Sequence, residues 1–308
     1  MAKISIIKGS ASILLGITFL FSAYIKLFPI ELFEFSFIEI HIANWDTAPF
    51  IARIFLALEF FLGLMLIFNY NGGNKKLAQV TLATLVIFTI YLVLIITIQG
   101  NSGNCGCFGT FIKMTPLESI VKNVLLMSLN AILFIAPTNQ NLSTNKSIFL
   151  SAAVASLISP FIINPLNSSS PPSENEINYT LKLDAIYDVN KKDMPSYDIR
   201  KGKRVIAFLS LTCEHCRIGA QKLNIIHQKH PEIPIFFILN GDVKNLKPFI
   251  EETKTNAIDY AFMSIKEGFI ENAGINFPAI LWVNNAKVEN RTKYTELNQD
   301  DLVKWYNK

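Results

Sequence analysis

Five apolar stretches in the first part of the chain constrain its fold more than any other feature. They cover residues 9–28, 49–68, 77–98, 117–136 and 147–165. A transmembrane helix needs about 20 consecutive, mainly apolar residues, so each stretch is long enough to cross a bilayer. The sequence therefore predicts an α-helical transmembrane bundle of four core spans, with a fifth span that links it to the rest of the chain.

The regions around the first stretch raise two further expectations. This stretch is longer than the apolar part of a signal peptide and lacks a small-residue cleavage site, so we expect a retained anchor. Residues 30–45, which follow it, are apolar but carry three glutamates and a histidine. We expect an amphipathic segment in the membrane interface there, with Trp45 near the head groups.

The charged residues of the chain are unevenly distributed. Residues 1–165 hold only nine of the 28 Lys/Arg and six of the 24 Asp/Glu, and the remainder lie in residues 166–308. The total charge is +4, and no basic patch with interleaved aromatic residues is present, so the composition excludes a typical nucleic-acid-binding protein. The contrast predicts a membrane domain over residues 1–165 followed by a soluble domain.

Residues 166–178, rich in serine and proline, have the composition of a flexible linker. From residue 179 to residue 308, short β-rich runs alternate with amphipathic helices, which predicts an α/β domain with a mixed sheet. The expected strands are 179–189, 205–211, 233–240, 259–264, 279–283 and 287–290, and the expected helices are 213–229, 243–253 and 299–307.

The soluble part contains the motif Cys213-Glu214-His215-Cys216 between a predicted strand and a predicted helix. N–H groups and the positive end of a helix dipole stabilise a thiolate at this position, which makes the first cysteine nucleophilic. We therefore predict thiol–disulfide exchange at Cys213 and Cys216. The alternatives are a structural disulfide or half of a zinc site, for which His227 and His230 are candidate ligands by residue type.

With this motif and with Phe277-Pro278 before the strand 279–283, residues 175–308 resemble the thioredoxin-like superfamily. The resemblance implies that Pro278 is cis and faces the cysteine pair, that Cys213 attacks and that Cys216 resolves. The chain departs from the family at two positions. Members usually have tryptophan just before the first cysteine, where this chain has Thr212, and many have a buried acid on the preceding strand, where it has Ala207. His215, if cationic, would stabilise the Cys213 thiolate and make the disulfide more oxidising.

A second cysteine pair, Cys105-Gly106-Cys107, follows the third apolar stretch in a loop rich in glycine and asparagine. Two cysteines separated by one residue close a small, strained ring, and strained disulfides are readily reduced. We therefore predict that Cys105 and Cys107 also exchange disulfides. A pair of ordinary thiols and a soft-metal site are the alternatives.

With Cys105-Gly106-Cys107-Phe108-Gly109, the first part of the chain resembles the DoxX-like family and, within it, the MauE branch. Further carriers of the resemblance, over residues 8–136, are Gly16-Ile17-Thr18-Phe19, Ser22-Ala23, Lys26-Leu27, Ala52-Arg53 and Glu59-Phe60-Phe61-Leu62-Gly63. MauE-like proteins are implied to support disulfide formation outside the cytoplasm together with a separate thioredoxin-like partner. In this chain, that partner looks fused to the membrane domain.

Glu59 lies about ten residues into the second apolar stretch, near the middle of the predicted span. An ionisable group at this depth is costly, which makes it a candidate functional residue. The alternative is a buried, protonated acid that is hydrogen-bonded to Thr18 or Ser22. Lys26 lies near the end of its own span, and we expect it to be too far away to pair with Glu59.

These observations predict a membrane-bound thiol–disulfide oxidoreductase, in a bacterial inner membrane, with a cytoplasmic N-terminus. The Cys213/Cys216 pair would take electrons from extracytoplasmic client proteins and pass them to Cys105/Cys107 and onward, plausibly to a quinone. The opposite direction would give a reductase or isomerase. A copper chaperone and an assembly factor for a secreted enzyme are the rival functions, although no Met-rich or His-rich tract supports the first.

Overall fold

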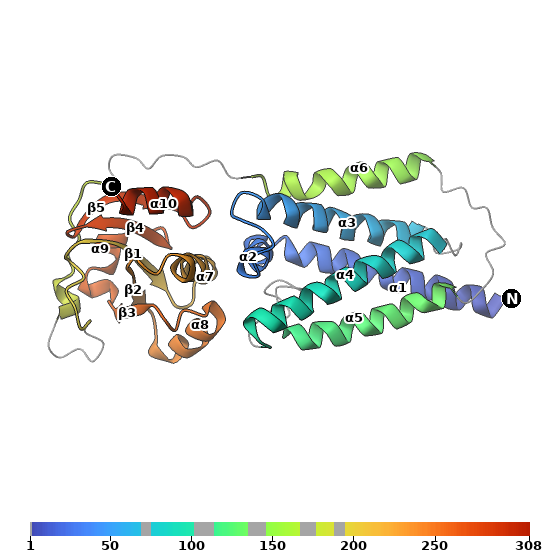
Figure 1. Cartoon of the computed structure of the whole chain (residues 1–308), viewed down its shortest axis with the longest axis horizontal. Helices are drawn as coiled ribbons and strands as arrows, with labels where there is room; N and C mark the ends of the chain where they lie inside the picture. Colours follow the sequence, from blue (N-terminus) through green and yellow to red (C-terminus); the bar gives the residue numbers. More distant parts are fainter. Residues whose placement is uncertain (1, 69–74, 102–113, 135–145, 167–176, 188–194) are drawn as a thin grey trace. The chain divides into compact units, whose positions relative to one another are not determined.

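The protein is described by a computed structural model, which divides into two compact units, Met1–Leu166 and Asn167–Lys308. The structure describes residues 2–68, 75–101, 114–134, 146–166, 177–187 and 195–308. Figure 1 shows the whole chain, and each unit is considered by itself below.

The first unit is entirely helical in its described residues. Its elements are α1 (Ala2–Lys26), α2 (Glu31–Glu39), α3 (Ala48–Phe68), α4 (Lys75–Gln99), α5 (Pro116–Ala131), η1 (Ile132–Phe134) and α6 (Lys146–Ile163). Four of the described helices, α1, α3, α4 and α5 with its η1 extension, are long and apolar enough to cross a membrane. The prediction of four core spans is thus confirmed, whereas α6 is apolar but shorter.

Two glycines allow α1 and α3 to approach closely. A Cβ atom on Gly16 would lie 2.8 Å from the carbonyl oxygen of Gly63, and one on Gly63 would lie 2.9 Å from that of Gly16. Small residues permit such close backbone contact between membrane helices, where packing provides much of the association energy. The hydrogen bond from Ser12 Oγ to the carbonyl oxygen of Leu66 (2.6 Å) strengthens the same contact.

Residues 30–45, for which an interfacial position stays a prediction, contain the helix α2. Their helix, α2, buries Phe33 and Phe37 in a cluster that also includes Leu56 and Tyr91. The ring of Phe37 contacts that of Tyr91, with centroids 5.3 Å apart. The apolar residues that suggested an interfacial position therefore pack against the helix bundle.

One end of the first unit holds the residues that flank the loop of Cys105 and Cys107 and the residue that precedes the linker. At this end the Asn164 side chain donates to the carbonyl oxygen of Leu27 (3.0 Å), and Arg53 of α3 donates to that of Asn164 (3.0 Å). The Gln99 side chain, at the end of α4, donates to Glu39 of α2 (2.8 Å). Residues 101 and 114, which flank the loop of Cys105 and Cys107, are thus at the same end as residue 164, before the linker (Figure 1).

The second unit is built on a five-stranded sheet with the order β3-β2-β1-β4-β5. The strands are β1 (Lys203–Ser210), β2 (Ile235–Asn240), β3 (Asp259–Phe262), β4 (Ala279–Asn284) and β5 (Lys287–Thr292). Pairing is parallel for β1–β2 and β2–β3 and antiparallel for β1–β4 and β4–β5. The helices are α7 (Glu214–Lys229), α8 (Leu246–Thr253), α9 (Phe269–Ala273) and α10 (Gln299–Tyr306), with short η3 (Asp184–Tyr187), η4 (Val243–Asn245) and η5 (Ile265–Glu267).

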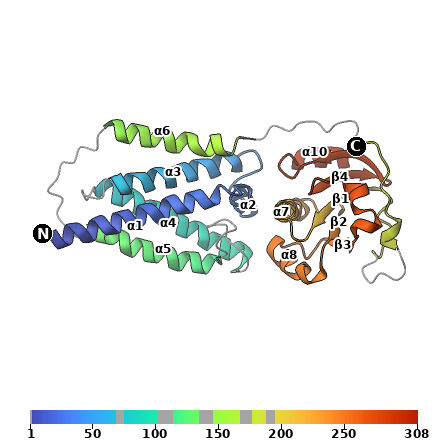
Figure 2. The same cartoon turned by 180° about the vertical axis from the view of Figure 1, so that it is seen from behind.

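Helices cover both faces of this sheet, as Figures 1 and 2 show for α7 and α9. On one face Phe208 contacts Phe269 of α9, with ring centroids 5.4 Å apart. On the other face Trp282 contacts Trp305 of α10, at 5.5 Å. The mixed sheet between helices confirms the predicted thioredoxin-like fold.

The predicted strand 179–189 is wrong. Its described residues form one isolated β-bridge, between Thr180 and Lys287. The short helix η3 follows and ends at Tyr187. Leu181, Leu183 and Ile186 are buried in the core on the α9 face of the sheet. Their apolar alternation therefore reflects a short extended segment, which makes three backbone hydrogen bonds with residues 286–288 and then turns into η3 instead of continuing as a strand.

Candidate functional site

The Cys213/Cys216 pair lies where β1 ends and α7 begins. Cys213 is the N-cap residue of α7, with extended backbone angles, and its side chain is half-buried. Cys216 is fully buried and accepts a hydrogen bond from the backbone N–H of Ser210 at its Sγ atom (3.3 Å). Of the two cysteines, Cys213 is therefore the one whose side chain is accessible.

The environment distinguishes the two thiols chemically. Burial is the main cause that raises the pKa of the Cys216 thiol far above its ordinary value, and the nearby Cys213 adds to the effect. Cys213 instead occupies the N-cap position of α7, at the positive end of the helix dipole, and its side chain makes no capping hydrogen bond. The arrangement therefore gives one half-buried sulfur that a partner can reach and one buried sulfur that stays protonated.

Pro278 follows a cis peptide bond after Phe277 and is buried against the same helix. A Cβ atom built on Gly219 would lie 3.1 Å from Pro278 Cγ and 3.3 Å from Tyr294 Cβ. A side chain at this position would therefore press on the loop of Pro278. Gly219 is three residues after Cys216, which is about one turn further along α7. Pro278 thus has the cis bond that the resemblance implied and lies against α7 at Gly219, while its position facing the cysteine pair stays a prediction.

Sequence reasoning missed Tyr294 and Gly219. The rings of His215 and Tyr294 lie 5.6 Å apart and 33° from parallel, so the tyrosine flanks the exposed histidine of the motif. The buried Lys222 holds this segment by donating to the carbonyl oxygen of Tyr294 (2.8 Å). A glycine inside a predicted helix was the only sequence signal for this contact, and nothing marked Tyr294.

Two further contacts fix the start of α7. Arg217 forms an ion pair with Glu252 of α8 and donates to the carbonyl oxygen of Leu211 (3.0 Å), which anchors the turn that carries Cys213. Ala207 is fully buried, in the place where the family has an acid. Among the described residues, no three His, Cys, Asp or Glu side chains gather closely enough to hold a metal ion.

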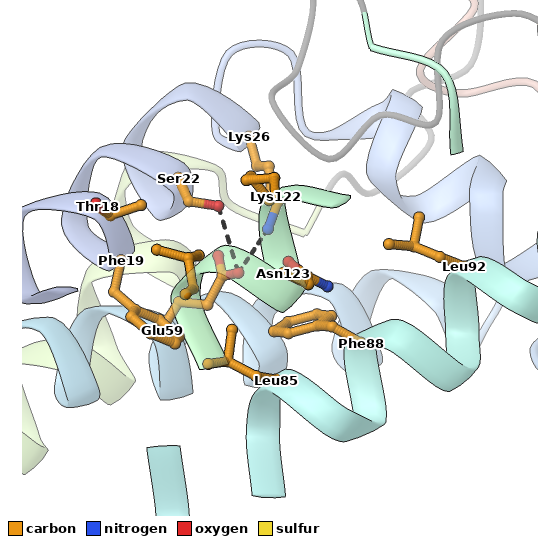
Figure 3. A pocket seen from close by; sticks show the side chains of 11 residues that line it. Thr18, Phe19, Ser22, Lys26, Glu59, Leu85, Phe88, Leu92, Lys122 and Asn123 are labelled. Atoms are coloured by element: carbon orange, nitrogen blue, oxygen red, sulfur yellow. Dashed lines mark hydrogen bonds and ion pairs between the residues drawn. The ribbon is translucent and has the colours of Figure 1, made fainter. Parts of the chain in front are cut away.

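A second candidate site lies inside the helical unit, around Glu59. Lys26 Nζ lies 2.6 Å from Glu59 Oε1, and Ser22 Oγ donates to the same oxygen at 3.5 Å (Figure 3). Our expectation that Lys26 is too far away was therefore wrong, because its long side chain reaches back from the end of α1. The rings of Phe33 and Phe88 flank the ammonium group, with centroids 5.1 and 5.0 Å away.

The ion pair borders a cavity between α1, α3, α4 and α5. Glu59 is almost fully buried, and no donor in the described part of the chain reaches its Oε2 atom. The cavity combines polar side chains with apolar ones, all drawn in Figure 3: Thr18, Phe19, Ser22, Lys26, Glu59, Leu85, Phe88, Leu92, Lys122, Asn123 and Leu126.

The remaining predicted site residues, Cys105 and Cys107, lie outside the described residues. The structure therefore places Cys213, Cys216 and His215 at the start of α7, and Pro278 against the same helix, in the second unit. It places Glu59 in a different environment, in the first unit.

Solved structures with related folds each cover about a third of this chain. A secreted disulfide oxidoreductase of Mycobacterium tuberculosis, homologous to DsbE of E. coli, is 16% identical, with coverage of 34% of this chain and 81% of that chain and a TM-score of 0.28. The thioredoxin domain of a thiol-disulfide oxidoreductase from Bacteroides vulgatus is 21% identical, with coverage of 35% and 76% and a TM-score of 0.29.

Similarity in sequence extends across both units. Protein TlpB of Flavobacterium psychrophilum is 27% identical over 300 residues, which cover 82% of this chain and 81% of that protein. The helical unit supplies the family match: residues 1–136 match the family described as methylamine utilisation protein MauE.

Proposed function

We propose that this multi-pass membrane protein is a thiol–disulfide oxidoreductase whose Cys213/Cys216 disulfide oxidises the thiols of extracytoplasmic client proteins. One observation carries the proposal: an accessible Cys213 occupies the N-cap position of α7, with a buried Cys216 in the first turn and the cis Pro278 against the same helix. A structural disulfide needs no accessible sulfur, whereas exchange requires a partner to reach one of the two atoms.

In the oxidised protein, a client thiolate attacks Cys213 Sγ, and the bond between Cys213 and Cys216 breaks. Cys216 leaves and takes up a proton, which its raised pKa favours. The second client thiol then attacks the mixed disulfide, so the client leaves with a new disulfide and Cys213 leaves as a thiolate. Two electrons have then passed from the client to the pair, with one proton held on Cys216 and the other released to the solvent.

Reoxidation of this pair by a Cys105/Cys107 disulfide forms the second half of the proposal. The residues on either side of that loop lie at the same end of the helical unit as residue 164, from which the linker starts. A tether replaces a bimolecular encounter by one at high effective concentration. With a cytoplasmic N-terminus, this end would face the outside, where disulfides persist.

The direction of electron flow follows from His215 in this proposal. The histidine is exposed next to Cys213, and a positive charge there stabilises the thiolate of the reduced pair. A more stable reduced pair makes the disulfide a stronger oxidant. Oxidation of clients is therefore the preferred direction over reduction or isomerisation.

Trapping with Cys216→Ser tests the relay, because this change removes the thiol that resolves mixed disulfides. We expect disulfide-linked products between Cys213 and extracytoplasmic clients, and others between Cys213 and Cys105 or Cys107, identified by mass spectrometry. A variant with both Cys213→Ser and Cys216→Ser is the matched control and should trap nothing. Capture of cytoplasmic proteins alone would contradict both the orientation and the relay.

A further inference from the structure

The cavity beside Glu59 has the properties of a ligand site that lies within a membrane-spanning unit. Its charged groups are Glu59 and Lys26, which are both almost fully buried and meet at 2.6 Å, and Lys122, which is partly exposed. The pair of Glu59 and Lys26 uses only one oxygen of the carboxylate, since Glu59 Oε2 has no donor in the described part of the chain. A buried acceptor without a donor is costly by about 1–3 kcal/mol, so a bound group that donates a hydrogen bond fits this position.

The shape of the cavity indicates how a ligand would enter. Its volume of about 30 Å³ has room for oxygen-sized groups, since a water molecule needs roughly 10–15 Å³ by the same measure. Thr18, Phe88 and Lys122 at its border are partly exposed, so the cavity opens toward the outside of the helix bundle. The polar edge of a ligand would therefore lie inside, with its apolar remainder between the helices and the lipid.

The chemistry of the lining restricts the class of ligand. None of the side chains that line the cavity carries sulfur, which soft metal ions prefer. Lys26 and Lys122 together outweigh the charge of Glu59, but the free Oε2 atom of Glu59 needs a hydrogen-bond donor, which a fully ionised lipid phosphate does not offer. A neutral group whose oxygen accepts from the Lys26 ammonium in one state, and donates to Glu59 in another, satisfies both residues.

We propose that this cavity receives one oxygen of the head group of a lipid-soluble quinone, the electron acceptor of the thiol–disulfide relay. The inference rests on the function proposed above. Oxidation of a dithiol breaks two S–H bonds, forms one S–S bond and releases two electrons and two protons. The quinone takes up all of these, and its two carbonyl groups become hydroxyl groups. The quinone carbonyl accepts from Lys26, and the hydroquinone hydroxyl donates to Glu59 Oε2.

The test is saturable binding of a decyl-substituted benzoquinone to the full chain in detergent, measured by calorimetry. The key variant combines Lys26→Met with Glu59→Gln, which removes both buried charges together and leaves neither without a partner. We expect its affinity for the quinone to fall by about tenfold or more, because hydrogen bonds to charged groups are lost.

A second buried ion pair in the same unit provides the matched control. Arg53 and Glu34 meet at 2.7 Å but do not line the cavity. The double variant with Arg53→Met and Glu34→Gln should bind the quinone with the affinity of the unmodified protein. Equal loss in both variants would show a general effect on the helix bundle and would overturn the site, as would no loss in the key variant or no saturable binding to the unmodified protein.

A variant with Cys105→Ser and Cys107→Ser separates this inference from the function on which it rests. We expect it to bind the quinone normally and to fail to reduce it with electrons from a reduced Cys213/Cys216 pair. Continued reduction in this variant would overturn the relay and leave the cavity as a quinone site. Conversely, trapped disulfides between the two pairs, without quinone binding, would overturn the cavity and leave the relay.

Discussion

The two candidate sites differ in how their polar side chains are buried and in what these side chains contact. In the second unit, Cys213 is half-exposed at a helix N-terminus, while its partner Cys216 is buried as a neutral thiol. In the first unit, Glu59 and Lys26 are both buried and both charged groups contact each other. Accessibility thus distinguishes the two thiols of the second unit, whereas pairing of opposite charges makes buried polar groups tolerable in the first unit.

The largest expected effect is at the accessible sulfur. Replacing Cys213 by serine removes the atom that a client reaches, so oxidation of a fluorescent dithiol peptide by the full chain should fall to the rate without protein. The fold should persist, because the side chain is only half-buried. Activity in this variant equal to that of the unmodified protein would contradict the role of Cys213.

The buried pair should respond to single changes and tolerate a double change. Glu59→Gln leaves the Lys26 ammonium buried with a neutral partner, and the free energy of unfolding should fall by about 3–5 kcal/mol. Adding Lys26→Met should restore most of this loss, which thermal unfolding in detergent measures. If the double variant is less stable than Glu59→Gln, the two charges do not act as a pair.

The buried thiol predicts a dependence on pH. Resolution of a mixed disulfide at Cys213 needs the Cys216 thiolate, whose fraction rises about tenfold per pH unit below its raised pKa. The resolution rate, followed by stopped-flow mixing, should therefore keep rising above pH 9.0, the ordinary pKa of a thiol. A plateau at that pH would show that Cys216 titrates normally.

The raised pKa of Cys216 also makes the stability of the folded protein depend on pH. Above pH 9.0 the unfolded chain releases the Cys216 proton while the folded chain retains it, so the free energy of unfolding of the reduced protein should fall as pH rises. The oxidised protein lacks the thiol and serves as the control. Identical pH profiles for the two forms would exclude this contribution.

Gly219→Ala should impair the contact between α7 and the proline loop. The new Cβ atom would press on Pro278 and Tyr294 at 3.1 and 3.3 Å, and such overpacking typically costs about 1–3 kcal/mol. Thermal unfolding of the second unit should show this loss, together with slower client oxidation. Ala220→Gly, at the next position of the helix, controls for the effect of glycine and alanine on the helix itself.

The smallest expected effect is at His215. His215→Phe keeps an aromatic ring next to Tyr294 but removes the positive charge that the histidine can carry. The reduction potential of the pair should become more negative by on the order of 30 mV, measured in glutathione buffers. A shift to a more positive potential would contradict the proposed direction of electron flow.

Sequence reasoning located the features that local chemistry determines. The four core spans were predictable because the bilayer sets their length and apolar character. Cys213 at the start of α7 was predictable because the motif separates a β-rich run from an amphipathic helix. The prediction of a strand over residues 179–189 was wrong because apolar residues alternate both in a strand and in a short extended segment that packs on a sheet.

Contacts between distant elements were beyond the reach of single-sequence reasoning. The pairing of Lys26 with Glu59 depends on how α1 lies against α3 and on the direction of a long side chain. The position of Tyr294 beside His215 depends on the loop after β5. Neither is encoded in a spacing along the chain, because each is a result of packing.

The glycine contact between α1 and α3 has a mechanical consequence for the membrane unit. At Gly16 and Gly63 the two helices are so close that an added Cβ atom would meet the backbone of the opposite helix and the side chain of Ile67 or Leu20. The two helices therefore act as a fixed wall that keeps Lys26 and Glu59 at a constant separation. Widening of the cavity has to come from α4 and α5, and the loop that carries Cys105 and Cys107 joins these two helices.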